Sequence, residues 1–239
     1  MILLVRGDRE FLVEPGEELH TDLGVVHVPE AVEPGQEVES HLGEVFRTRA
    51  LRGPDLFDHF ERTGAPMMPR DIGLLVGHTG IKVGDRVLDA GTGTGVLAAF
   101  LGRMGASVTT YERDPAFAEV ARENMRMAAV ADAVEVRTGD LTEALPDLAG
   151  FDVLTLDTAD APTVVSSAPD LLVSGGFLAV YSPFVEAARE VETTAREAGL
   201  GDVETVETIQ RRMDFDDRGS RPSTKGVGHT GYLTYGRRL

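Results

Sequence analysis

The sequence predicts an α/β protein in which a doubly wound parallel sheet follows a small β domain. Three observations support this prediction. Short apolar runs separated by Gly and Pro fill residues 1–53, strand-like and helical segments alternate from residue 86 onward, and residues 87–95 read as an apolar strand that enters three alternating glycines. The first feature is typical of a small β fold and the other two of a larger α/β domain.

The N-terminal residues 1–53 predict a small β-barrel or sandwich. Apolar runs at 2–5, 11–13, 25–28 and 44–46 have the length of short strands. Turn-forming Gly and Pro residues separate these runs. A helical connector is expected over residues 54–64, and the main domain over residues 65–239.

In the main domain, the segment that opens at Pro66 predicts a helix through His78. Strands are then expected at 86–90, 108–111, 134–137, 153–157 and 177–182, and helices at 95–104, 115–127, 162–172 and 185–198. Two further apolar stretches, 203–209 and 232–235, are expected to close the sheet as an antiparallel pair.

The glycine-rich segment carries the main functional signal. Gly91, Gly93 and Gly95 lack a Cβ, so the chain can turn sharply and approach a ligand before the next helix begins. Glu112 ends the next expected strand, 21 residues after Gly91, which is the distance expected for an acid that binds ribose hydroxyls. The glycines alone also fit a tight turn without a ligand, but the flanking strand, the helix and Glu112 favour a nucleotide-cofactor loop.

The spacing G-x-G-x-G differs from the dinucleotide pattern G-x-G-x-x-G. With Asp89 before it, it resembles the first motif of S-adenosylmethionine-dependent methyltransferases, which have a Rossmann-like sheet. The resemblance implies S-adenosylmethionine as cofactor. Asp140 follows the third expected strand, where its side chain could accept from the adenine amine or cap the next helix. The implied cofactor-binding residues are Asp89, Gly91, Thr92, Gly93, Thr94, Gly95, Glu112 and Asp140.

Composition limits the remaining possibilities. The 239 residues include no cysteine, so no disulfide is possible, and no apolar run is long enough to cross a bilayer. The apolar run at the start of the sequence is too short, and charged residues follow it too early, for a signal peptide. A soluble cytoplasmic protein that does not contact a membrane is therefore expected. The net charge of −17 comes with only two lysines among 23 basic residues, a bias that indicates adaptation to high salt.

The C-terminal residues differ in charge from the rest of the chain. Residues 211–239 carry a net charge of +4, whereas residues 1–210 carry −21. This basic segment could contact nucleic acid phosphates. Its arginines could equally pair with Asp214, Asp216 and Asp217.

Blocks along almost the whole chain resemble the tRNA adenine-58 methyltransferase family, which makes 1-methyladenosine. The resemblance implies tRNA as partner, a homotetramer, and Asp157, at the end of an apolar strand, as the catalytic residue. The residues implied to bind substrate are Arg211, Arg212, Arg221, His229 and Thr230. The blocks are His20–Gly24, Ser40–Gly43, Pro69–Gly73, Val87–Gly95, Tyr111–Glu112, Leu156–Asp157, Ala179–Pro183 and Gly228–Tyr232.

This chain departs from the family pattern at three places. Met68 stands where the family has an aromatic residue, Arg70 where it has lysine, and residues 158–162 replace a proline-rich stretch. These differences leave open whether adenine 57 is methylated as well as adenine 58. The alternatives are a methyltransferase acting on a protein or small molecule, a non-catalytic RNA-binding subunit, and a nicotinamide oxidoreductase, which the glycine spacing disfavours.

Overall fold

The computed structural model describes all residues, 1–239. The chain forms two compact units, Met1–Phe60 and Glu61–Leu239. Each is described by itself.

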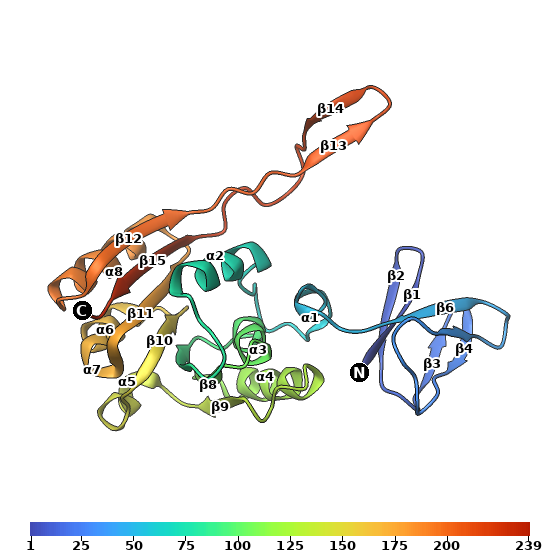
Figure 1. The fold of residues 1–239 in the computed structure, drawn as a ribbon, viewed down its shortest axis with the longest axis horizontal. Coiled ribbons are helices and arrows are strands. Elements are labelled where there is room, and N and C mark those ends of the chain that lie inside the picture. Colours follow the sequence, from blue (N-terminus) through green and yellow to red (C-terminus); the bar gives the residue numbers. More distant parts are fainter. The chain divides into compact units, whose positions relative to one another are not determined.

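The first unit is a small β domain (Figure 1). An antiparallel sheet has the order β2-β1-β6-β5, and β3 and β4 form a separate hairpin, so the unit consists of two sheets rather than a closed barrel. Side chains from both sheets, among them Leu4, Val26 and Phe46, share one apolar core. The strands are β1 (Ile2–Arg6), β2 (Arg9–Val13), β3 (Glu18–Thr21), β4 (Gly24–His27), β5 (Glu37–Glu39) and β6 (Val45–Arg49), and helix α1 (Gly53–His59) follows.

The second unit contains a seven-stranded Rossmann-like sheet with the order β12-β15-β11-β10-β7-β8-β9. Strands β7 to β11 are parallel, whereas β15 runs antiparallel to both of its neighbours, so the sheet is mixed. The expected antiparallel pairing of the last two apolar stretches is thus confirmed. The strands are β7 (Arg86–Ala90), β8 (Ser107–Glu112), β9 (Val134–Thr138), β10 (Phe151–Leu156), β11 (Leu172–Ser182), β12 (Gly201–Glu207) and β15 (Tyr232–Arg237).

Helices flank this sheet (Figure 1). The expected single helix over 162–172 is wrong, because α6 ends at Ser166 and α7 begins at Ala168. Pro169 explains the break, since its nitrogen cannot donate a hydrogen bond and its ring would clash with the preceding turn. The helices are α2 (Pro69–Thr79), α3 (Val96–Arg103), α4 (Pro115–Met127), α5 (Leu141–Ala144), α6 (Ala161–Ser166), α7 (Ala168–Leu171) and α8 (Val185–Glu197), with a 3-10 turn at Leu145–Asp147.

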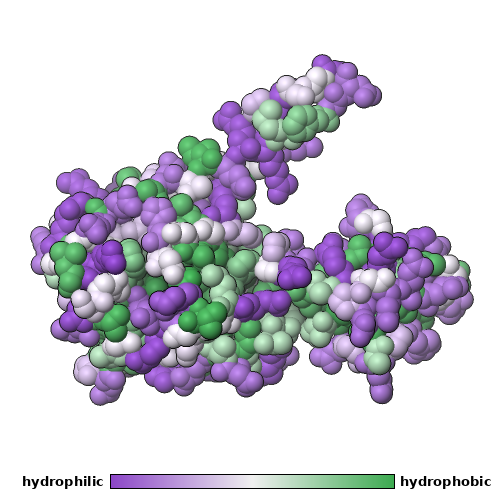
Figure 2. All heavy atoms as spheres, viewed as in Figure 1, coloured by the Kyte–Doolittle hydropathy of each residue, from purple (hydrophilic) through white to green (hydrophobic).

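Between β12 and β15 the chain leaves the sheet and forms a hairpin of β13 (Met213–Asp216) and β14 (Gly219–Pro222), which the sequence reading did not predict. The hairpin projects from the end of β12 and β15 (Figure 1). Its surface places hydrophobic side chains beside hydrophilic ones (Figure 2), with Met213 and Phe215 exposed.

Candidate active site

The glycine loop joins β7 to α3 at the carboxyl end of the sheet, where ligands of open α/β sheets bind. All three glycines have positive φ: +89° at Gly91, +50° at Gly93 and +81° at Gly95. A methyl group on Gly91 would lie 2.0 Å from the Asp157 carbonyl oxygen, and one on Gly95 would lie 2.6 Å from Met125 Cε. At Gly93 the nearest atom would be 3.8 Å away, so this part of the loop borders open space.

Asp89 is buried at the end of β7 and is held by both neighbouring strands. Its carboxylate accepts hydrogen bonds from Thr110 Oγ1 of β8 and Thr155 Oγ1 of β10, each at 2.5 Å. Burial raises the pKa of Asp89 above its ordinary value, and the two threonine hydrogen bonds partly oppose that shift. Asp89 also borders the recess beside the loop, so it can meet a ligand there directly or through water.

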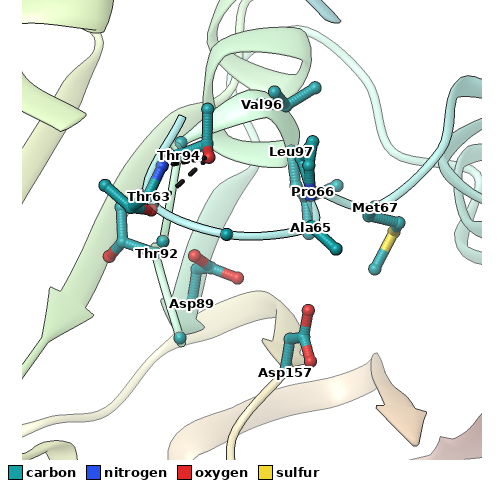
Figure 3. Close-up of a pocket in the computed structure, with 14 residues that line it drawn as sticks. Thr63, Ala65, Pro66, Met67, Asp89, Thr92, Thr94, Val96, Leu97 and Asp157 are labelled. Carbon is teal, nitrogen blue, oxygen red and sulfur yellow. Dashed lines mark hydrogen bonds between the residues drawn. The ribbon is translucent and has the colours of Figure 1, made fainter. Parts of the chain in front are cut away.

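The two threonines of the loop fix its shape. Thr92 Oγ1 lies 2.5 Å from Thr110 Oγ1, which links the loop to the Asp89 network. Thr94 Oγ1 accepts from the backbone N–H of Thr63 at 3.3 Å (Figure 3). Both threonines line the recess, but both hydroxyls also have partners within the protein.

Two recesses lie on either side of Gly91. The first is bordered by the glycine loop, Asp89, Asp157 and the segment Thr63–Met67 (Figure 3). The second is bordered by Glu112, Asp140 and the residues around them. An elongated ligand can therefore pass across Gly91 and occupy both recesses.

Glu112 and Asp140 face the second recess. Glu112 Oε2 accepts from the backbone N–H of Gly93 at 2.9 Å, so the acid and the glycine loop are joined directly. Asp140 Oδ1 accepts from the backbone N–H and hydroxyl of Thr142, at 2.8 and 2.7 Å, and so caps α5. These hydrogen bonds, and to a smaller extent Arg113, lower the pKa of Asp140. Its other oxygen lies 3.6 Å from Arg113 Nε.

Asp157 directly follows β10 and lies where the first recess meets a third hollow, a cavity of about 360 Å³. Asp157 is exposed to solvent through these openings, while desolvation by the neighbouring protein atoms is the main influence on its carboxyl. Burial, followed by the negative charge of Asp89, raises the pKa of Asp157 to about 7. Asp157 is thus the acid shared by both spaces.

The walls of the cavity are largely apolar and come from the ends of β10 and β11 and from α6 and α8. Tyr181, Pro183 and Phe184 form one side, and Pro162 lies on α6. Phe184 is 69% exposed although it is a large apolar residue. Flat apolar side chains of this kind suit a planar heterocycle.

Three of the expected substrate-binding residues, Arg211, Arg212 and Arg221, are exposed at the projecting hairpin and do not line the Asp157 cavity. They form no ion pair with Asp214, Asp216 or Asp217. The hairpin has one internal ion pair, at 3.0 Å between Arg218 Nη2 and Asp216 Oδ2.

His229 and Thr230 have partners within the protein. His229 Nδ1 lies 2.6 Å from Glu207 Oε1 and Nε2 lies 3.2 Å from the Pro183 carbonyl oxygen, and its pKa is raised, chiefly by Glu207. Thr230 Oγ1 donates to Asp71 Oδ2 at 2.9 Å. The structure therefore shows both residues tying the C-terminal loop to the rest of the unit.

The sequence reading missed several residues of this site. The Thr63–Met67 segment lines the cofactor-side recess but carries no recognisable motif. Thr110 and Thr155 hold Asp89. The signal for Thr155 is a hydroxyl near the end of the mostly apolar strand β10, whereas Thr110 lies in β8 beside other hydroxyl residues and carries no distinct signal. Phe184 follows the block Ala179–Pro183. An aromatic residue just beyond a strand end could have indicated a side chain that lines the binding cavity.

No group of side chains in the structure has the composition and proximity of a metal site. None of its helices has the length and apolar character needed to cross a membrane.

The sheet order, the glycine loop and the acids at the ends of β7 and β8 define a Rossmann-like S-adenosylmethionine-dependent methyltransferase. The recesses fit this cofactor, because they adjoin at Gly91, the loop borders open space at Gly93, and both recesses offer carboxylate acceptors. A family model described as "tRNA methyltransferase complex GCD14 subunit" matches residues 61–219, and the chain belongs to this family.

Curated relatives include two tRNA methyltransferases. The chain is 34% identical to "tRNA (adenine(57)-N(1)/adenine(58)-N(1))-methyltransferase TrmI" of Methanocaldococcus jannaschii, over 97% of this chain and 92% of the relative. It is 30% identical to "tRNA (adenine(58)-N(1))-methyltransferase TrmI" of Thermus thermophilus, over 75% of this chain and 72% of the relative.

Among solved structures, a SAM-dependent O-methyltransferase of Thermotoga maritima matches with a TM-score of 0.84 and 26% identity. The match covers 100% of this chain and 92% of the other. The likeness includes the N-terminal β unit as well as the methyltransferase sheet.

Proposed function

We propose that this protein transfers a methyl group from S-adenosylmethionine to ring nitrogen 1 of an adenine in tRNA, at position 58 or at positions 57 and 58. The observation that carries this proposal is the place of Asp157, which borders both the cofactor-side recess and the apolar cavity. Methyl donor and acceptor base can therefore meet at one carboxylate. The curated relatives named for this reaction support the choice of substrate.

The cofactor would lie across Gly91. Glu112 would bind the ribose hydroxyls and Asp140 the adenine amine in the second recess, while Asp89 and the loop of Gly91, Thr92, Gly93, Thr94 and Gly95 would hold the methionine end. When bound, S-adenosylmethionine supplies an electrophilic methyl group on a sulfonium cation. Asp140 keeps one oxygen on the α5 cap, so its other oxygen is the acceptor available for a ligand.

Asp157 would be the catalytic residue. Ring nitrogen 1 of adenine already has a lone pair, so the attack requires alignment, which can supply roughly 7–11 kcal/mol of the barrier lowering. Methylation makes the base cationic and its exocyclic amine more acidic. A carboxylate hydrogen-bonded to that amine favours the transition state and can accept the departing proton.

The target adenine must leave its tertiary pairing in folded tRNA to enter the cavity, where Tyr181, Pro183 and Phe184 offer flat surfaces. Arg211, Arg212 and Arg221 would contact phosphates around it, a role supported by their exposure and by their lack of acidic partners. His229 and Thr230 would contribute by holding the loop beside the cavity.

We further propose a cytoplasmic homotetramer adapted to high salt, with residues 1–53 as a β domain, 54–64 as a connector and 65–239 as the catalytic domain. The acidic, lysine-poor composition supports the salt adaptation. The Debye length is only about 3 Å in molar salt, so the repulsion between like charges on the surface is screened there. The family resemblance supports the tetramer. Mass measurement by light scattering at low and molar KCl would test both.

The test is to incubate the protein in molar KCl with unmodified tRNA transcript and labelled S-adenosylmethionine, then digest the RNA and map the labelled nucleoside. We expect 1-methyladenosine at position 58, or at 57 and 58, and none with Asp157→Asn, which keeps the side-chain shape. Label on another nucleoside would refute the adenine assignment. Cofactor binding without any labelled RNA would instead support a protein or small-molecule substrate.

A further inference from the structure

A buried asparagine of α4 holds the segment that borders the cofactor-side recess. Residues 61–67, here called the strap, lie between α1 and α2 and supply Thr63–Met67 as one wall of that recess. Asn124 is 0% exposed, and its side chain contacts both the strap and the glycine loop. Its Nδ2 donates to the Glu61 carbonyl oxygen at 3.0 Å and to the Thr94 carbonyl oxygen at 2.9 Å. Its Oδ1 accepts from the Glu61 N–H at 3.2 Å.

These partners fix the orientation of the Asn124 amide. A carbonyl oxygen can only accept and a backbone N–H can only donate, so Nδ2 must face the two carbonyl groups and Oδ1 must face the N–H. Both protons of the amide group therefore have an acceptor. Aspartate has the same shape but would place acceptors against two carbonyl oxygens, and leucine would leave all three backbone groups without this partner. The position thus requires the donors and the acceptor that asparagine combines.

A second link lies two residues further along the strap. The Thr63 N–H donates to Thr94 Oγ1 at 3.3 Å, and the two hydroxyl oxygens are 3.4 Å apart (Figure 3). Thr94 is therefore bound twice, through its carbonyl oxygen to Asn124 and through its hydroxyl to the strap. Beyond Thr63 the strap continues through Pro66 to Met67, which line the recess (Figure 3). One wall of the recess is thus attached to the glycine loop that forms another.

We propose that Asn124 is a positioning residue that latches the strap onto the glycine loop, so that the strap slows the release of bound S-adenosylmethionine. This inference rests on the cofactor placement in the proposed function and concerns retention of the cofactor, not the choice of substrate. Asn124 lines neither recess, so it acts through the strap. Loss of the latch should speed cofactor release and leave methyl transfer at saturating cofactor nearly unchanged.

The first test is the exchange rate of two strap amide protons, measured by NMR in the wild type and in Asn124→Ala. The Glu61 N–H loses its own acceptor in the variant, so faster exchange there would follow from any local role. The Thr63 N–H keeps its acceptor, Thr94 Oγ1, and exchanges faster only if the strap is released as a unit. We expect its exchange to be about tenfold faster, because several hydrogen bonds are lost together. An unchanged Thr63 rate would overturn the latch.

Ala118→Gly is the control for a general loss of stability. Ala118 is buried on the same helix, and glycine there weakens α4 without removing any hydrogen bond of the strap. This variant should have a lower Tm but the wild-type exchange rate at Thr63 and the wild-type rate of cofactor release. If Ala118→Gly matched Asn124→Ala in both rates, the effects would come from the weakened helix, and the latch would be overturned.

The second test is the release of S-adenosylhomocysteine from the purified protein. Its dissociation rate should be about tenfold higher in Asn124→Ala, while kcat with saturating S-adenosylmethionine and tRNA stays within about twofold and KM for the cofactor rises. Faster exchange at Thr63 with an unchanged release rate would show that the strap does not retain the cofactor, and would overturn the proposal.

The wild type supplies a further measurement that needs no variant to fold. Bound S-adenosylhomocysteine should slow exchange of the Thr63 N–H, because a ligand that contacts the latched strap stabilises the latched state. An unchanged rate would overturn the proposal. A protein that shows the expected release and exchange but makes no 1-methyladenosine would overturn the proposed substrate and leave the latch standing.

Discussion

The backbone of Gly91 lies directly against the backbone of Asp157. The Asp157 N–H donates to the Ala90 carbonyl oxygen at 2.8 Å, and a side chain at Gly91 would overlap the Asp157 carbonyl group. The glycine loop and the proposed catalytic acid are therefore parts of one rigid corner, and a change in the loop moves the acid.

Gly91→Ala and Gly93→Ala should have different effects. At Gly91 the added methyl cannot be accommodated without displacing the backbone of Asp157, so we expect a loss of several kcal/mol of folding stability, or failure to fold. At Gly93 the methyl has room and φ is +50°, so stability should fall by about 1 kcal/mol while cofactor affinity falls at least tenfold. Thermal unfolding and calorimetric titration would check this, and equal stability of the two variants would contradict it.

The activity should depend on pH through Asp157. The carboxylate is the proposed active form, so kcat/KM for the cofactor should fall as pH drops below about 7, the pKa of Asp157. The bound sulfonium cation favours the carboxylate, so kcat should hold to a lower pH than kcat/KM. Profiles of kcat and kcat/KM from pH 5 to 9 would show this difference. Protonation of the ring nitrogen of free adenine, titrated separately in solution, would serve as the reference for any pH effect that comes from the base itself. Coincident profiles would argue against a cation bound beside Asp157.

The same pKa predicts how stability varies with pH. Because the folded-state pKa of Asp157 is raised from 3.8 to about 7, the folded protein binds more protons than the unfolded chain between these values, and stability is lost as pH rises through about 7. Asp157→Asn removes the free-energy cost of holding an ionised carboxylate at this position above about pH 7. Solvent in the cavity reduces the effect to on the order of 1 kcal/mol, so Tm at pH 8 should rise by about 2–4 °C, with little change at pH 4. An equal shift of Tm at both pH values would exclude this cause.

If Arg211 and Arg212 contact tRNA phosphates, replacing both with Gln should flatten the salt dependence of tRNA binding. Each lost phosphate contact removes about 0.7–0.9 from the slope of log K against log salt. Arg122→Gln with Arg126→Gln is a control with the same change in net charge, because these α4 arginines pair with Glu119 and Glu123. If both double variants gave the wild-type slope, the hairpin arginines would have no role in phosphate contact.

Much of the sheet was predictable because local signals and tertiary structure agree there. The apolar strands before Gly91 and Glu112 are bounded by turn-forming residues, and the helix expected at 115–127 is α4, with Asp114 as its N-cap. The β13–β14 hairpin was missed because its strands have only four residues each and are largely exposed: apolar and acidic residues alternate in β13 over too short a run to be distinctive, and β14 shows no alternation. The partners of Thr230 could not be predicted either, because Asp71 lies 159 positions away and no local pattern joins them.

The position of β15 has a consequence for how the chain is made. This strand is hydrogen-bonded between β11 and β12, although it follows both of them in the sequence. Until it emerges from the ribosome, β12 has no neighbour in the sheet, and β11 leaves an open edge that can pair with other chains. The nascent protein therefore cannot complete this sheet before residue 237 is available, and deletion of a few residues from β15 should harm folding more than a deletion of similar length within the β13–β14 hairpin.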